Sequence, residues 1–89
     1  INNSKEIGNY IIKQINDLNL PKVREVRGMG LMIGIGLKVR AGEYVHKLMT
    51  EHKILALLAG PLTIRLLPPL CITKEQADQV ITTLKEVLN

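Results

Sequence analysis

Aromatic side chains are nearly absent from this chain. Among its 89 residues there is no Phe and no Trp, and Tyr10 and Tyr44 are its two tyrosines. The composition is nevertheless 46% hydrophobic and 22% charged, which is typical of a folded globular protein and excludes disorder. The core must therefore be built from branched aliphatic residues and methionine.

The chain contains one cysteine, Cys71. A single cysteine excludes an internal disulfide and agrees with a reducing compartment, so a cytoplasmic location is expected. Cys71 lies between Leu70 and Ile72 without a histidine nearby, and this context favours a small buried hydrophobic residue over a reactive thiol.

Runs of one charge are also missing. Twelve basic and eight acidic residues give a net charge of +4, which permits an acidic partner without requiring one. The basic residues are scattered between Lys5 and Lys85, and no aromatic residues alternate with them to stack on bases. Nucleic-acid binding is therefore not expected.

Membrane and metal sites are disfavoured as well. The longest apolar stretch, residues 54–70, is interrupted by Gly60, Pro61, Arg65 and Pro68, whereas a membrane span needs about 20 apolar residues. His46 and His52 are separated by about 240° around a helix, so they cannot bind one metal ion together as an i, i+4 pair would. We expect neither membrane insertion nor a metal site.

The length suits one small domain. At this size folding buries only about 60–65% of the surface of the unfolded chain, so an isolated core is marginal. The chain begins at Ile1, without a methionine and without a secretory signal. We expect it to be a fragment of a longer protein.

Three segments have the apolar spacing of amphipathic helices. The apolar positions are Ile7, Ile11, Ile15 and Leu18 in the first, Ala41, Tyr44, Val45, Leu48 and Met49 in the second, and Ala77, Val80, Ile81, Leu84 and Leu88 in the third. Asn19 and Pro21 are expected to end the first helix, and Thr73 with Gln76 forms a capping-box pattern at the start of the last.

Four short segments favour strands. They are residues 23–27, 31–38, 54–58 and 63–67, separated by the bend at 28–30 and the turn at Gly60-Pro61, and Pro68-Pro69 should end the sheet. In the second strand, Leu31, Ile33, Ile35 and Leu37 share one face and Met32, Gly34 and Gly36 share the other. Two glycines on one face allow another group to approach the backbone closely.

The resulting order is helix, strand, strand, helix, strand, strand, helix. Short connections between these elements favour an α+β two-layer sandwich, in which helices cover a small, mainly antiparallel sheet. The spacing Gly28-x-Gly30-x-x-x-Gly34 does not match a dinucleotide-binding fingerprint, because the spacing differs and a strand follows it rather than a helix.

Arg65 is unusual because it interrupts the apolar run Ile64-Arg65-Leu66-Leu67. One interpretation is structural: the arginine extends to the sheet edge or pairs with a carboxylate of the domain. The other is functional: its planar guanidinium holds a substrate carboxylate by two parallel hydrogen bonds. Spacing alone leaves both open.

Two motifs add a resemblance. Residues 23–34 read V-R-E-V-R-G-M-G-L-M-I-G, and residues 63–73 read T-I-R-L-L-P-P-L-C-I-T. Together they resemble the C-terminal small domain of class-III pyridoxal-phosphate-dependent aminotransferases, fold-type-I enzymes of the acetylornithine and ornithine type. The resemblance covers nearly the whole chain, so residues 1–89 are interpreted as that domain, with the large cofactor-binding domain absent.

The resemblance implies roles for four residues. Arg65 matches the arginine that binds the α-carboxylate of the amino-acid substrate and of 2-oxoglutarate. Arg27, Gly28 and Gly30 match a motif that shapes the active site. The Schiff-base lysine and the phosphate-binding loop belong to the large domain in this family, so we assign no catalytic, cofactor-binding or metal-binding residue here.

By the same resemblance, the full-length protein is a homodimeric aminotransferase that uses pyridoxal 5'-phosphate. It would move an amino group between an acetylornithine- or acetyl-lysine-type substrate and 2-oxoglutarate in arginine or lysine biosynthesis, and the fragment alone would be inactive. Residues 59–63 resemble those of archaeal enzymes of arginine and lysine biosynthesis, a group that includes enzymes whose substrate is attached to a small acidic carrier protein. The alternative is a free-standing α+β regulatory or interaction module of amino-acid metabolism.

Overall fold

The computed structural model describes residues 2–29, 32–67 and 73–89. Their elements, in chain order, are α1 (Asn2–Leu18), β1 (Val23–Met29), β2 (Met32–Leu37), α2 (Gly42–Glu51), β3 (Ala56–Leu58), β4 (Thr63–Leu66) and α3 (Lys74–Leu88). This is the order of elements that the sequence predicts.

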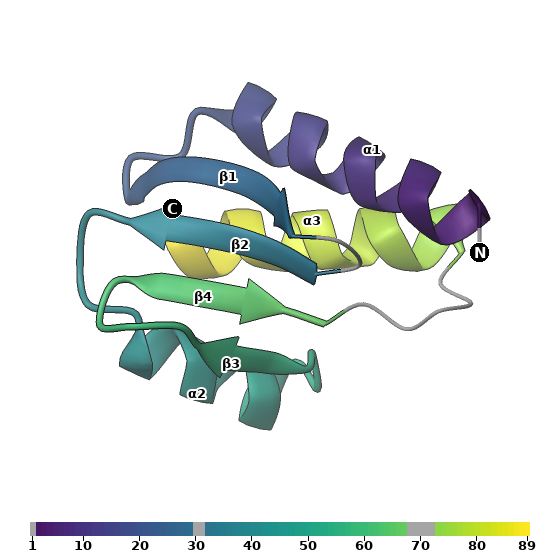
Figure 1. Cartoon of the computed structure of the whole chain (residues 1–89). Coiled ribbons are helices and arrows are strands. Elements are labelled where there is room, and N and C mark those ends of the chain that lie inside the picture. Colours follow the sequence, from purple (N-terminus) through teal and green to yellow (C-terminus); the bar gives the residue numbers. More distant parts are fainter. Residues whose placement is uncertain (1, 30–31, 68–72) are drawn as a thin grey trace.

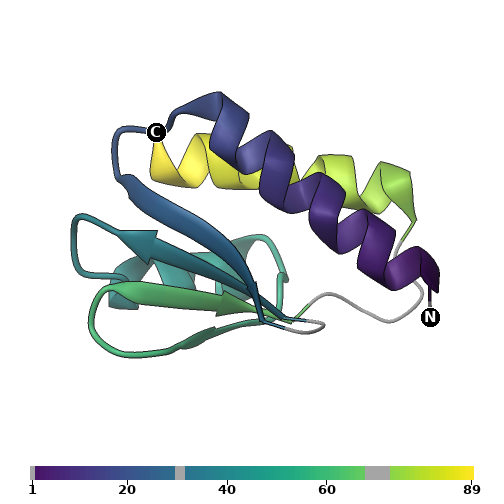
Figure 2. The ribbon, with the colours of Figure 1, turned by 45° about the horizontal axis from the view of Figure 1, so that its top comes forward.

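The four strands form one sheet in the order β1-β2-β4-β3, and each neighbouring pair is antiparallel. The helices lie on one side of this sheet, with α1 and α3 side by side although they are at opposite ends of the chain (Figures 1 and 2). The expected α+β two-layer sandwich is confirmed. The opposite face of the sheet is not covered by any described helix.

The core lies between the sheet and the helices. Ile33, Ile35, Ile64 and Leu66 from the two central strands are fully buried, and Ile35 lies directly opposite Ile64 in the register. The buried helix residues facing them are Ile7, Ile11, Ile15, Val45, Leu48, Ala77, Leu84, Val87 and Leu88. As the composition predicts, the core is aliphatic.

Local signals set the ends of two helices. Asn19 has φ 48, a left-handed conformation that asparagine tolerates well and that ends α1. Thr73 caps α3: its hydroxyl accepts a hydrogen bond from the Gln76 amide at 3.1 Å, and its own amide donates to the Gln76 side chain at 3.0 Å. The predicted capping box is confirmed.

The largest differences from the prediction concern two strand boundaries and one helix residue. The first strand continues to Met29 instead of stopping at Arg27, because Gly28 pairs with Ile33 within the ladder. The third strand begins only at Ala56, because Lys53 has φ 55 and turns the chain so that the Ile54 amide donates to the Leu48 carbonyl. Met49, predicted to face the core, is 43% exposed. It therefore lies outside the buried stripe of α2.

Cys71, Leu31 and the double proline at 68–69 lie outside the described residues. Within the described part of the chain, no helix combines the length and the apolar character that crossing a membrane requires.

Candidate functional site

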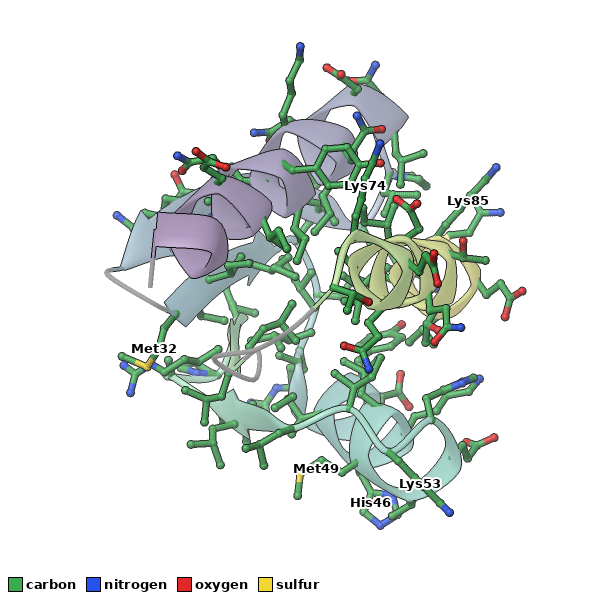
Figure 3. All side chains as sticks on the ribbon, turned by 90° about the vertical axis from the view of Figure 1, so that its right-hand side faces the viewer. Met32, His46, Met49, Lys53, Lys74 and Lys85 are labelled. Atoms are coloured by element: carbon green, nitrogen blue, oxygen red, sulfur yellow. The ribbon has the colours of Figure 1, made fainter. Side chains whose placement is uncertain are left out.

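One row of residues crosses the helix-free face of the sheet. Arg27 on β1 lies opposite Gly34 on β2, Gly34 lies opposite Arg65 on β4, and Arg65 lies opposite Leu57 on β3. Directly opposed residues of antiparallel strands project from the same face of the sheet. Met32, two residues before Gly34, points away from α2 and α3 (Figure 3). The row therefore lies on the face opposite the helices.

Arg65 is the central charged residue of this row. It lies on β4, which is paired on both sides by β2 and β3, so it is not at a sheet edge. Its side chain is partly buried, and its Nε is fully buried without a hydrogen-bond partner. The ion pairs found among the described residues do not include Arg65. Pairing with a carboxylate of the domain, one of the two structural interpretations, finds no support among these ion pairs.

A buried donor without a partner is costly. Leaving such a group unsatisfied costs about 1–3 kcal/mol, and more for a charged group, so folded proteins contain few of them. The guanidinium of Arg65 therefore has hydrogen-bonding capacity that the described residues do not use. An anion with two oxygens in one plane is the group that fits a guanidinium best.

Arg27 is placed differently from Arg65. Its side chain is 69% exposed, and its Nη2 lies 3.4 Å from Oε1 of Glu25. Arg24 approaches the same oxygen at 3.7 Å, because the register of β1 shifts between Val23 and Glu25. Glu25 thus binds two arginines of β1 and leaves Arg65 unpaired among the described residues.

The sequence did not indicate this role of Glu25. In a regular strand, adjacent residues such as Arg24 and Glu25 project to opposite faces. The irregularity between Val23 and Glu25 brings them together over Gly36. The sequence shows the three charged residues of this strand, Arg24, Glu25 and Arg27, but it has no reliable signal for the bulge that brings them together.

The glycines of the first motif have separate positions. Gly28 lies within β1, and a Cβ added there would come within 3.3 Å of the Ile12 side chain on α1. Gly28 therefore allows α1 to pack closely on the sheet. Gly30, also predicted to shape the active site, lies outside the described residues. The roles of Arg27, Gly28 and Gly30 at an active site stay predictions.

Other kinds of site find no support in the described residues. No group of three or more His, Cys, Asp or Glu side chains within ranges 2–29, 32–67 and 73–89 could hold a metal ion. No polar or charged residue among those whose burial is described is fully buried, and this includes the lysines. These lysines do not fit a Schiff-base site, which requires a lysine enclosed with its cofactor.

The described residues thus form an α+β sandwich, and its open sheet face carries Arg65, whose Nε has no hydrogen-bond partner among them. The chain matches the family Aminotransferase class-III over residues 1–88. The chain therefore belongs to the class-III aminotransferase family.

Individual relatives agree with this assignment. The chain is 44% identical over 86 residues to the LysW-aminoadipate semialdehyde transaminase of Deinococcus radiodurans, covering 97% of this chain and 20% of the relative. It is 41% identical over 83 residues to the acetylornithine aminotransferase of Methanosarcina mazei, covering 93% of this chain and 21% of the relative.

A solved aminotransferase structure has a similar fold. The structure of Plasmodium falciparum ornithine delta-aminotransferase matches with a TM-score of 0.84 and 31% identity, covering 97% of this chain and 23% of that one. The chain thus spans about a fifth of the length of the curated relatives it matches.

Proposed function

We propose that residues 1–89 form the C-terminal small domain of a pyridoxal-phosphate-dependent aminotransferase, and that Arg65 binds the carboxylate of its substrates. The observation that carries the proposal is the buried Nε of Arg65, which has no hydrogen-bond partner among the described residues. Membership of the class-III aminotransferase family, over residues 1–88, supports it. The same match disfavours a free-standing regulatory module.

In this proposal Arg65 orients the substrate. The guanidinium accepts a carboxylate through two parallel N–H···O bonds, which fix the direction of the amino acid as well as its position. Such positioning of a reacting group can lower a barrier by several kcal/mol. Because Arg65 projects from a strand held on both sides, its backbone position is defined by the sheet.

Pyridoxal 5'-phosphate would supply the electron sink for the carbanion chemistry. Because the lysines of described burial are not enclosed, we assign the residues that hold this cofactor to the larger part of the protein. The chain alone is then inactive. Homodimerisation and a cytoplasmic location are part of the same proposal and follow from the family resemblance.

The substrate is proposed to be an acetylornithine- or acetyl-lysine-type amino acid, with 2-oxoglutarate as the amino acceptor, in arginine or lysine biosynthesis. The names of the Deinococcus and Methanosarcina relatives support this range. The first of them acts on a LysW-linked substrate by its name, and a carrier-linked substrate is therefore included. The net charge of +4 is compatible with an acidic carrier.

The test is Arg65→Ala in the full-length enzyme. Losing two charge-assisted hydrogen bonds should raise the KM for glutamate and for the amino-group donor by about a hundredfold each. Arg40→Ala is the matched control, because Arg40 is an exposed arginine in the connection between β2 and α2. Unchanged KM values for both substrates of Arg65→Ala would refute the assignment. Assays with acetylornithine, ornithine, acetyl-lysine and carrier-linked substrates identify the donor.

A further inference from the structure

Gly34 lies between Arg27 and Arg65 in the row that crosses the open face. It lies directly opposite Arg27 on one side and Arg65 on the other. It is buried, although it has no side chain and no described helix covers this face.

The surroundings of Arg65 are asymmetric. On the β3 side it faces Leu57, whose isobutyl group is 44% exposed and occupies space above the sheet. On the β2 side it faces Gly34, where there is no side chain at all. Opposed Cβ atoms of an antiparallel pair are about 4.5–5.5 Å apart, so any side chain at position 34 would be in contact with the stem of Arg65.

Arg27 has an ion-pair partner on its own strand. Its guanidinium is bound to Glu25, two residues earlier on the same strand. Glu25 in turn lies over Gly36, since a Cβ added to Gly36 would be 3.1 Å from the Glu25 Cγ. The two glycines thus have different neighbours: Gly36 lies under the Glu25 ion pairs, and Gly34 lies beside Arg65.

We propose that Gly34 is a positioning residue for Arg65: the absence of a side chain at position 34 gives the guanidinium the room in which it meets the substrate carboxylate. The inference rests on the proposed function of Arg65. It adds that carboxylate affinity depends on a residue that donates no hydrogen bond to the substrate. A side chain at position 34 occupies that room and displaces the guanidinium.

The experiment compares Gly34→Val with Gly36→Val in the full-length enzyme. Both substitutions place the same β-branched side chain on the same strand and face, and valine is favourable in strands. They differ in that a Cβ at position 36 would be 3.1 Å from the Glu25 Cγ, so valine there also displaces Glu25. Thermal unfolding of both variants measures their general effects on the sheet. The residue opposite on β4 differs: it is Arg65 for Gly34 and Thr63 for Gly36.

The first measurement is calorimetric binding of glutarate, a dicarboxylate that lacks the amino and keto groups and so reports on the carboxylate site without turnover. Gly34→Val should weaken glutarate binding about tenfold, the effect of losing one hydrogen bond to a charged group, and Gly36→Val by less than about twofold. In steady-state assays Gly34→Val should raise the KM for glutamate by about the same factor and change kcat little.

The outcomes separate this inference from the proposed function. If Arg65→Ala weakens glutarate binding but the two valine variants behave alike, Gly34 has no special role and the inference is wrong. If Arg65→Ala leaves glutarate binding unchanged, the proposed function itself fails. Should Gly34→Val not fold, Gly34→Ala and Gly36→Ala replace the pair, and equal affinities of these two variants would also overturn the inference.

Discussion

The Tyr10 hydroxyl on α1 donates a hydrogen bond to Oδ1 of Asp78 on α3, with an oxygen–oxygen distance of 2.6 Å. Lys74, one turn earlier on α3, places its Nζ 5.3 Å from the centre of the Tyr10 ring. These contacts join the first and last helices of the chain on the outer side of the sandwich, where α1 and α3 lie side by side (Figure 2). One tyrosine therefore links two segments that are far apart in sequence.

The Tyr10–Asp78 bond predicts a pH dependence of stability. The hydrogen bond to Asp78, followed by desolvation and the negative charge of Asp78, raises the pKa of Tyr10 above its ordinary value of 10.0. The folded state then keeps a proton that the unfolded state releases, so the free energy of unfolding decreases as pH rises from about 10 through the raised pKa. Below pH 10 this contribution is fully present.

Tyr10→Phe should remove that part of the pH dependence. Urea unfolding of the wild type and the variant at several pH values between about 8 and 11 gives the free energy of unfolding of each protein. The free energies of the two proteins should converge as pH rises and Tyr10 ionises. Tyr44→Phe, at the other tyrosine, is the control, because it leaves the Tyr10–Asp78 hydrogen bond in place. A wild-type slope in Tyr10→Phe would show that the Asp78 bond does not contribute.

A second prediction concerns the start of α3. Thr73→Ala removes the hydroxyl that accepts from the Gln76 amide, and loss of such a cap costs about 1 kcal/mol in the free energy of unfolding. Thr82→Ala is the matched control, because Thr82 is an exposed threonine in the interior of the same helix. Alanine has the higher helix propensity there, so this variant should not lose stability. Denaturant unfolding should show a loss for Thr73→Ala alone, and equal stability of the two variants would contradict the capping role.

The elements of the fold could be predicted because their signals are local. The capping box at Thr73 and Gln76, the helix end at Asn19 and the alternation of Ile33, Ile35 and Leu37 each depend on residues close together in sequence. The order β1-β2-β4-β3 could not be derived in this way. It depends on which strands pair, and pairing is decided by contacts between distant residues.

The same distinction applies to the site. Arg65 could be selected from sequence because a charge within an apolar run is visible there. The position of Gly34 directly beside it could not be, since 30 residues separate the two and only the antiparallel register of β2 and β4 brings them together. The pairing of Glu25 with two arginines was missed for a related reason, because it follows from an irregularity in β1.

A last prediction separates the charge of Arg65 from its shape. In the proposed function the guanidinium binds a carboxylate by two parallel bonds, whereas the ammonium of lysine is a point charge without that planar geometry. Arg65→Lys in the full-length enzyme should therefore raise the KM for glutamate by about tenfold, between the wild type and the hundredfold increase expected for Arg65→Ala. Steady-state kinetics of the three proteins measures this order. Equal KM values for Arg65→Lys and the wild type would mean that positive charge alone is sufficient, and equal values for the two variants would mean that the planar fork is required for any binding at this position.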